Sequence, residues 1–131
     1  MKTIQESGYV DTAEAVIKRL KSRTNQRTGR PEPMVTTSKI RGLLSMSSDI
    51  YNNVLNQSDD QLTEEENGRI DYLRMRFVYE SGRDPQVKSF VSEAKILDIL
   101  KEVGGSRKNY ILFNHYLEAL VAFHKYYDGK D

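Results

Sequence analysis

Apolar residues recur at the spacing of an α-helix along most of this chain, and this periodicity constrains the fold more than any other feature. The strongest example begins near Thr37, where one helical face collects small and apolar side chains, namely Ile40, Leu43, Leu44, Ser47, Ile50, Tyr51 and Val54. No segment alternates apolar and polar residues with a period of two, which is the pattern of a half-buried β-strand. With 131 residues, of which 37% are hydrophobic, the chain can bury one modest core. We therefore predict an all-α fold, a small bundle of about five helices in a single domain over residues 1–131.

The five predicted helices begin at or near residues with helix-start chemistry: Asp11, Thr37, Thr63, Asp84 and Ser106. Glu14 completes an acidic capping box in the first helix, and the motif TEEE does the same in the third. Gly82 is expected to end the third helix, and the fourth to continue to Gly104 and Gly105. The last helix is the most hydrophobic, so it is predicted to lie at the centre of the bundle. Four residues of the third helix are assigned to the core: Ile70, Leu73, Phe77 and Val78.

Residues 24–35 are expected to form a mobile basic linker, because they combine Gly29, Pro31 and Pro33 with polar side chains and offer little to bury. The formal net charge of +1 conceals an uneven distribution, since residues 1–35 are mainly basic and residues 58–71 mainly acidic. A polyanion would therefore have to meet a local patch of the surface. The absence of cysteine and of a long apolar run leads us to expect a soluble, cytoplasmic protein.

Catalytic and metal-binding patterns are not found in the sequence. His115 and His124 are nine residues apart, which puts them on opposite faces of one predicted helix and excludes a shared metal ion. The acidic residues Asp59, Asp60 and Glu64 are better explained as a solvated helix start than as magnesium ligands of a small nuclease. We therefore predict no enzyme activity, no metal and no cofactor.

The third predicted helix carries basic and aromatic residues at steps of three and four, which place them in one stripe: Arg69, Tyr72, Arg76, Tyr79 and Arg83. Guanidinium groups form forked hydrogen bonds with phosphate oxygens, and tyrosines can stack on bases, so the stripe suits a nucleic-acid backbone. Equally, these arginines can pair with Glu80, Asp84 or acids of neighbouring helices. The sequence leaves both interpretations open.

Two helix starts combine hydroxyl groups with cations and form candidate phosphate sites. In TTSKIR, residues 36–41, the side chains of Thr37 and Ser38 stand beside Lys39 and Arg41. Ser106, Arg107 and Lys108 repeat this arrangement, although an ordinary serine cap followed by solvated charges explains it as well.

Three stretches together resemble one protein family: TTSKIRGLLSMSSDIYN, RIDYLRMRFVYESGRDPQVKSFVSEAKILDIL and NYILFNHYLEALVAFHKYYDGKD. The chain resembles the small subunit of the type III-A CRISPR interference complex, the Csm complex, from Thr36 onward and in the shorter segment YVDTAEAVIKRL. The resemblance implies a helical bundle without chemistry of its own, present in several copies that stack as an inner filament. It further implies guide RNA, target RNA, backbone subunits and the large subunit as partners.

The predicted RNA-binding set combines the residue patterns with this resemblance: Lys39, Arg41, Arg69, Arg74, Arg76, Tyr79, Arg83, Arg107, Lys108 and Lys125. Contacts from Lys and Arg to the RNA backbone carry little base information, so any guide sequence would be accepted. The alternative is a helical protein-interaction module whose basic residues bind acidic partner subunits and not RNA.

Overall fold

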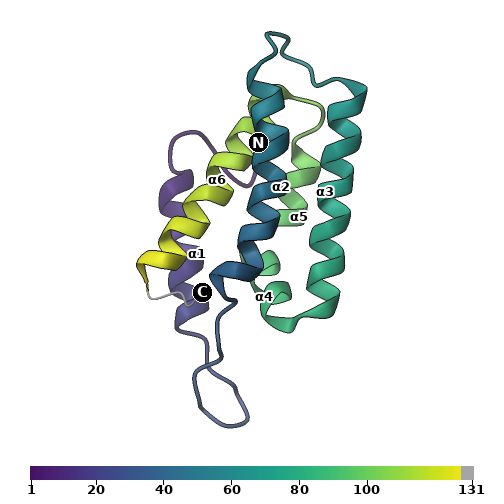
Figure 1. Cartoon of the computed structure of the whole chain (residues 1–131). Helices are drawn as coiled ribbons and strands as arrows, with labels where there is room; N and C mark the ends of the chain where they lie inside the picture. Colours follow the sequence, from purple (N-terminus) through teal and green to yellow (C-terminus); the bar gives the residue numbers. More distant parts are fainter. Residues whose placement is uncertain (128–131) are drawn as a thin grey trace.

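Six α-helices make up most of residues 1–127, the part of the chain that this computed structural model describes (Figure 1). In chain order they are α1 (Tyr9–Lys21), α2 (Thr37–Leu55), α3 (Glu64–Arg83), α4 (Pro85–Glu93), α5 (Ile96–Glu102) and α6 (Arg107–Tyr126). Within residues 1–127, β-structure is limited to two isolated bridges, Thr24 with Pro31 and Gln61 with Ser106. The predicted all-α fold is therefore confirmed. None of the helices in residues 1–127 has the length and apolar character that crossing a bilayer requires.

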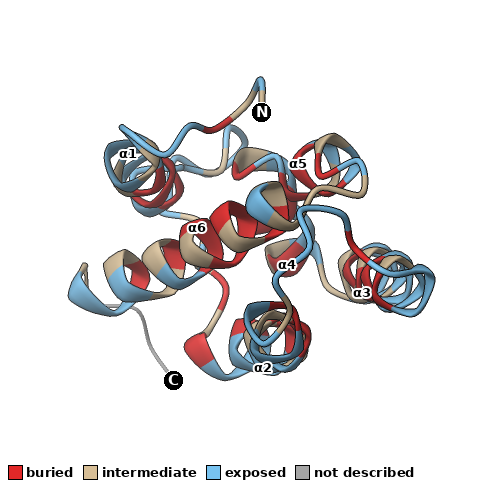
Figure 2. Cartoon of the chain, turned by 90° about the horizontal axis from the view of Figure 1, so that it is seen from above, coloured by how far each residue is buried: buried red, intermediate tan, exposed pale blue. Residues whose placement is uncertain are grey.

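Helix α6 passes through the middle of the bundle, and the other helices surround it (Figure 2). It packs most extensively against α2 and α1, and the predicted central position of the last helix is thus confirmed. Its buried tyrosines are also anchored by hydrogen bonds, because Tyr110 Oη donates to Ser47 O at 2.8 Å and Tyr116 Oη to Ala94 O at 3.0 Å. Since burial disfavours the charged phenolate, it raises the pKa of both tyrosines well above 10.

Helix α3 lies at the edge of the bundle, where it packs against α2, α4 and α5 (Figure 2). The predicted capping box is present: Thr63 Oγ1 accepts from Glu66 N at 3.1 Å, and Glu66 Oε1 accepts from Thr63 N at 2.9 Å. The other carboxylate oxygen of Glu66 accepts from Asn53 Nδ2 of α2 at 3.0 Å. Leu73 and Phe77 are buried in the core, whereas Val78 is 53% exposed. The core assignment of Val78 was therefore wrong.

The predicted fourth helix is divided into α4 and α5 at Lys95, which has a left-handed backbone with φ of 56°. A left-handed conformation costs a residue with a side chain about 1 kcal/mol or more. The change of direction buries Ala94 and Ile96 on its two sides, together with Phe90 and Ile99. Core packing thus overrides a sequence that contains neither glycine nor proline at the break.

Two predicted helix ends also differ from the structure. Helix α1 begins at Tyr9, after Gly8 at φ 109°, so Asp11 lies in the first turn and does not cap the helix. Helix α3 continues through Gly82 to Arg83, and Asp84 follows it in an extended conformation.

Residues 22–35 form a turn that projects from the end of the bundle where α2 begins (Figure 1). Asn25 N donates to Arg30 O at 2.7 Å, and Glu32 N donates to Arg23 O at 3.0 Å. Val35, the last residue of this segment, is buried in the core. The mobility of the segment stays a prediction.

Candidate nucleic-acid interface

The basic and aromatic stripe of α3 lies on the surface. Tyr72 and Tyr79 are about half exposed, and Arg69 and Arg83 are exposed. Arg69 and Tyr72 also line a groove of about 440 Å³ between α3 and α2. The helical geometry expected of the stripe is confirmed, and its ligand stays a prediction.

Tyr79 stands between two arginines near the end of α3. The guanidinium carbon of Arg76 lies 5.3 Å from the centre of the Tyr79 ring, and that of Arg83 lies 5.5 Å from it. Both arginines also contact one carboxylate oxygen, Glu80 Oε1, at 3.1 and 3.5 Å. Two cations therefore share one acid, which leaves an excess positive charge beside an exposed aromatic ring. The predicted alternative of intramolecular pairing is thus present in part.

The start of α2 lies beside the end of α3, because Lys39 Nζ forms an ion pair with the carboxylate of Asp84. This contact, together with the hydrogen bond from Gln86 N, lowers the pKa of Asp84 below its ordinary value of 3.8. Ser38 and Arg41 are exposed on the same helix start. Arg41 makes no ion pair within residues 1–127.

Thr37 differs from the expectation for a phosphate site. Its side chain is buried, and Oγ1 lies 3.1 Å from His124 Nδ1. The Nε2 atom of His124 is close to Val35 O at 2.5 Å. The Thr37 hydroxyl therefore connects α2 to α6, and only Ser38 of the two predicted hydroxyls reaches the surface.

The remaining predicted residues lie elsewhere on the molecule. Arg107 Nε donates to Val54 O at 3.0 Å. It therefore satisfies a carbonyl group in the last turn of α2, at the opposite end of the bundle. Lys108, nearby, lies 3.8 Å from Glu6. Lys125 is exposed next to the buried His124, at the end of the molecule where α2 begins. Arg74 is on the flank of α3 that faces α5, so it does not belong to the stripe.

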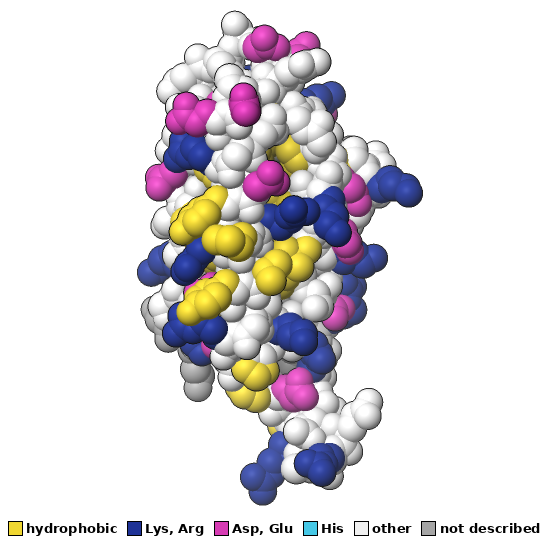
Figure 3. Space-filling model, turned by 90° about the vertical axis from the view of Figure 1, so that its right-hand side faces the viewer, with side chains coloured by type: hydrophobic (Ala, Val, Ile, Leu, Met, Phe, Trp, Pro, Cys, Tyr) yellow, Lys and Arg dark blue, Asp and Glu magenta, His cyan; other side chains and the backbone are white. Residues whose placement is uncertain are grey.

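Additional cations lie at the end of the molecule where α2 begins. Arg27 and Arg30 of the projecting turn and Lys88 of α4 are exposed. Figure 3 shows the face that carries α3: Asp and Glu gather at its upper end, and Lys and Arg lie along it and on the projection below. The sequence shows that residues 24–35 are basic. It does not show that they lie near Lys39, because that depends on the fold.

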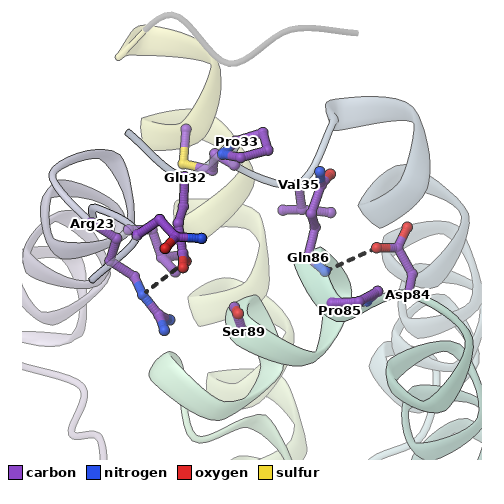
Figure 4. A pocket seen from close by; sticks show the side chains of 11 residues that line it. Arg23, Glu32, Pro33, Val35, Asp84, Pro85, Gln86 and Ser89 are labelled. Atoms are coloured by element: carbon purple, nitrogen blue, oxygen red, sulfur yellow. Dashed lines mark hydrogen bonds and ion pairs between the residues drawn. The ribbon is translucent and has the colours of Figure 1, made fainter. Parts of the chain in front are cut away.

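A cavity of about 420 Å³ separates the projecting turn from the start of α4 (Figure 4). Its charged lining residues are already engaged, because Arg23 pairs with Glu32 at 3.7 Å and Asp84 accepts from Gln86 N at 2.9 Å. Ser89 also lines the cavity without a histidine among its neighbours there. The lining therefore lacks the serine–histidine pair of a common type of hydrolytic site.

The two histidines are used in packing. His115 Nε2 lies 3.1 Å from Tyr51 Oη, and its ring stacks on Tyr9 at a centroid distance of 6.4 Å. Within residues 1–127, no three histidine or acidic side chains gather as metal ligands would. Together these features define a class of protein: a small helical bundle whose conspicuous surface is a basic and aromatic helix.

Comparisons with known proteins give the family. The model of the type III-A Csm2 family matches residues 12–130. The chain is 37% identical over 131 residues to the CRISPR system Cms protein Csm2 of Streptococcus thermophilus, with 100% of both chains covered. It is 38% identical to the protein of that name in Mycobacterium tuberculosis strain CDC 1551, over 100% of this chain and 99% of the relative. A third, from Enterococcus italicus, is 35% identical over 112 residues, 80% of this chain and 79% of the relative.

The chain therefore belongs to the Csm2 family of type III-A CRISPR systems. The resemblance found in the sequence is confirmed, and the family is that of a small subunit of the Csm complex.

Proposed function

We propose that this chain is a non-catalytic small subunit of a type III-A RNA-guided interference complex and that it holds guide and target RNA without reading their sequence. The observation that supports this most is the stripe on α3, where Arg76 and Arg83 flank the half-exposed ring of Tyr79 and where Tyr72 is also half exposed. Arginine forks bind phosphate oxygens, and tyrosine rings stack on bases of any identity.

The ion pairs along the stripe are compatible with RNA binding. The side chains of Arg76 and Arg83 are 35% and 62% exposed, and exposed ion pairs contribute only about 0.2–1 kcal/mol each. A phosphate group can therefore replace Glu80 as the partner of either guanidinium. Because such contacts reach the backbone and not the base edges, sequence recognition is left to pairing between guide and target.

The start of α2 extends this surface. The pair between Lys39 and Asp84 brings Lys39, Arg41 and Ser38 next to the end of α3. Backbone N–H groups at a helix start favour anions, and the Thr36 side chain does not cap this one. Arg27 and Arg30 add exposed cations at the same end.

The proposed setting is a cytoplasmic ribonucleoprotein that contains several copies of the chain, stacked as an inner filament. Backbone subunits and the large subunit are the proposed protein partners, and cleavage chemistry belongs to them. Repetition along the RNA multiplies weak contacts, because each bound copy raises the effective concentration of the next contact.

The test removes both arginines of the Tyr79 cluster, in the variant Arg76→Ala/Arg83→Ala. Binding to two RNAs of unrelated sequence should weaken by the same factor. The slope of log K against log salt should fall by about 1.4–1.8, because each phosphate contact contributes about 0.7–0.9. Lys18→Ala, which removes an exposed cation from α1, is the matched control and should change neither quantity appreciably.

Loss of affinity for only one of the two RNAs would contradict sequence-independent binding. Unchanged RNA affinity together with impaired assembly would instead favour the alternative, a protein-interaction module whose basic residues bind acidic partner subunits.

A further inference from the structure

Helix α3 exposes apolar side chains as well as cations. The large apolar residues that are exposed within residues 1–127 are Val10, Leu55, Tyr72, Met75, Val78, Tyr79 and Tyr126. Four of these seven lie on α3, and two of the four, Tyr72 and Tyr79, belong to the stripe already described. The other two, Met75 and Val78, are each 53% exposed and have no role in that stripe.

Met75 and Val78 border a groove between α3 and α5. The groove has a volume of about 320 Å³, and Leu97 of α5 forms its opposite wall. A second hollow of about 440 Å³ shares Asp71, Arg74 and Lys101 with it and continues to Gly104 and Gly105. We call the two hollows together the α3/α5 groove. It lies on the flank of α3 opposite to the groove lined by Arg69 and Tyr72.

The charges of the α3/α5 groove are unbalanced. Arg74 and Lys101 flank the apolar wall, and neither forms an ion pair within residues 1–127. Asp71 is the acid among the residues that line both hollows. A complementary ligand therefore offers apolar groups together with carboxylates.

This combination fits a protein better than RNA. Met75, Val78 and Leu97 are aliphatic and provide no ring on which a base could stack, in contrast to Tyr72 and Tyr79. A phosphate backbone gains nothing from covering an aliphatic wall, whereas an apolar side chain of a protein gains free energy from burial there.

A symmetric contact between two copies fits poorly as well. In a two-fold interface each groove faces its own equivalent, so the contact would enclose Arg74 and Lys101 of both copies with only Asp71 of each to balance them. Like charges across an interface disfavour association.

We propose that the α3/α5 groove is a docking site for a different protein subunit. That subunit places an apolar side chain between Met75, Val78 and Leu97 and carboxylates against Arg74 and Lys101. The proposal rests on the proposed function only in that the partner belongs to the same complex. Helix α3 then has two binding surfaces. The cationic and aromatic stripe binds RNA, and the aliphatic side of the α3/α5 groove binds protein.

The experiment uses the complex assembled from the remaining subunits and guide RNA, to which labelled chain is added. The test variant is Met75→Ser/Val78→Ser, which removes the apolar wall without changing charge. The affinity of the labelled chain for the rest of the complex should fall about tenfold or more, as is typical when a central apolar contact of an interface is lost. Val10→Ser removes a similarly exposed apolar residue from α1 and should leave incorporation within about twofold.

Four further measurements make the result decisive. Arg74→Glu/Lys101→Glu should also reduce incorporation, since it places acids against the carboxylates of the partner. The affinity of the isolated Met75→Ser/Val78→Ser chain for RNA should stay within about twofold of the original. Its sedimentation and its thermal unfolding should match those of the unchanged chain.

Normal incorporation of Met75→Ser/Val78→Ser would overturn the proposal. A parallel loss of RNA affinity would assign the groove to RNA, and a change of the isolated chain from oligomer to monomer would assign it to a second copy; both results overturn the proposed partner. Failure of Arg76→Ala/Arg83→Ala to weaken RNA binding would refute the proposed RNA function and leave the docking site standing.

Discussion

If RNA binds the α3 stripe as proposed, Glu80 competes with its phosphates for two arginines, and removing the charge of Glu80 is expected to increase RNA affinity. In the structure, Glu80 Oε1 contacts both Arg76 and Arg83. If RNA phosphates bind these guanidinium groups, the two ion pairs must be given up on binding. Glu80→Gln keeps the shape of the side chain and abolishes this competition.

The magnitude follows from the exposure of the pairs. Each exposed pair contributes about 0.2–1 kcal/mol, so two pairs oppose RNA binding by about 0.4–2 kcal/mol. At 25 °C this corresponds to an increase in affinity of about two- to thirtyfold. Fluorescence anisotropy with two labelled RNAs of unrelated sequence should show the same increase for both.

Glu93→Gln is the matched control. Glu93 of α4 pairs with Arg19 of α1 at 2.5 Å, away from the stripe, and both substitutions raise the formal net charge by one. A general electrostatic effect would increase affinity equally in both variants. Unchanged or weaker binding by Glu80→Gln would refute the view that these arginines are released to phosphate.

Three further predictions concern stability and are measured by urea unfolding. Lys95→Gly should stabilise the protein by about 1 kcal/mol, because glycine adopts a left-handed backbone without strain. The control Lys88→Gly, within α4, should destabilise the protein by about the same amount. Stabilisation by both substitutions or by neither would contradict the strain assigned to Lys95. Thr63→Ala should cost about 0.5–2 kcal/mol because it removes the acceptor for Glu66 N, and an unchanged midpoint would show that this cap contributes little. Since the pKa of Asp84 is lowered in the folded protein, its carboxylate stabilises the fold above pH 3.8, and this stabilisation is lost as the pH falls through the lower folded pKa. The unfolding free energy of Asp84→Asn should therefore depend less on pH in acid than that of the unchanged chain. An identical pH dependence would contradict the role assigned to Lys39.

Features that depend on neighbours in the sequence could be predicted from it. The capping box at Thr63 needs only residues three positions apart, and the alignment of Arg76, Tyr79 and Arg83 needs only helical geometry. Both are present in the structure. The apolar periodicity was also sufficient to place the last helix at the centre of the bundle.

Features that depend on distant residues could not be predicted. The break at Lys95 serves the burial of Ala94 and Ile96 against other helices, and no local residue signals it. Thr37 turns inward because His124 lies opposite, 87 residues later in the chain. Val78 is apolar, but it lies on the exposed flank of α3 and borders the α3/α5 groove. Its side-chain chemistry alone did not indicate that it lies outside the core.

The central position of α6 has a consequence for biosynthesis. Helices α1 and α2 both rely on it for most of their packing, yet it is made after all the other helices of residues 1–127. A ribosome that has reached only α5 therefore holds a chain in which α1 and α2 lack their main packing partner. Completion of the core has to wait until Tyr110, Tyr116 and their neighbours leave the exit tunnel, so α1 and α2 reach their final packing only after α6 has emerged.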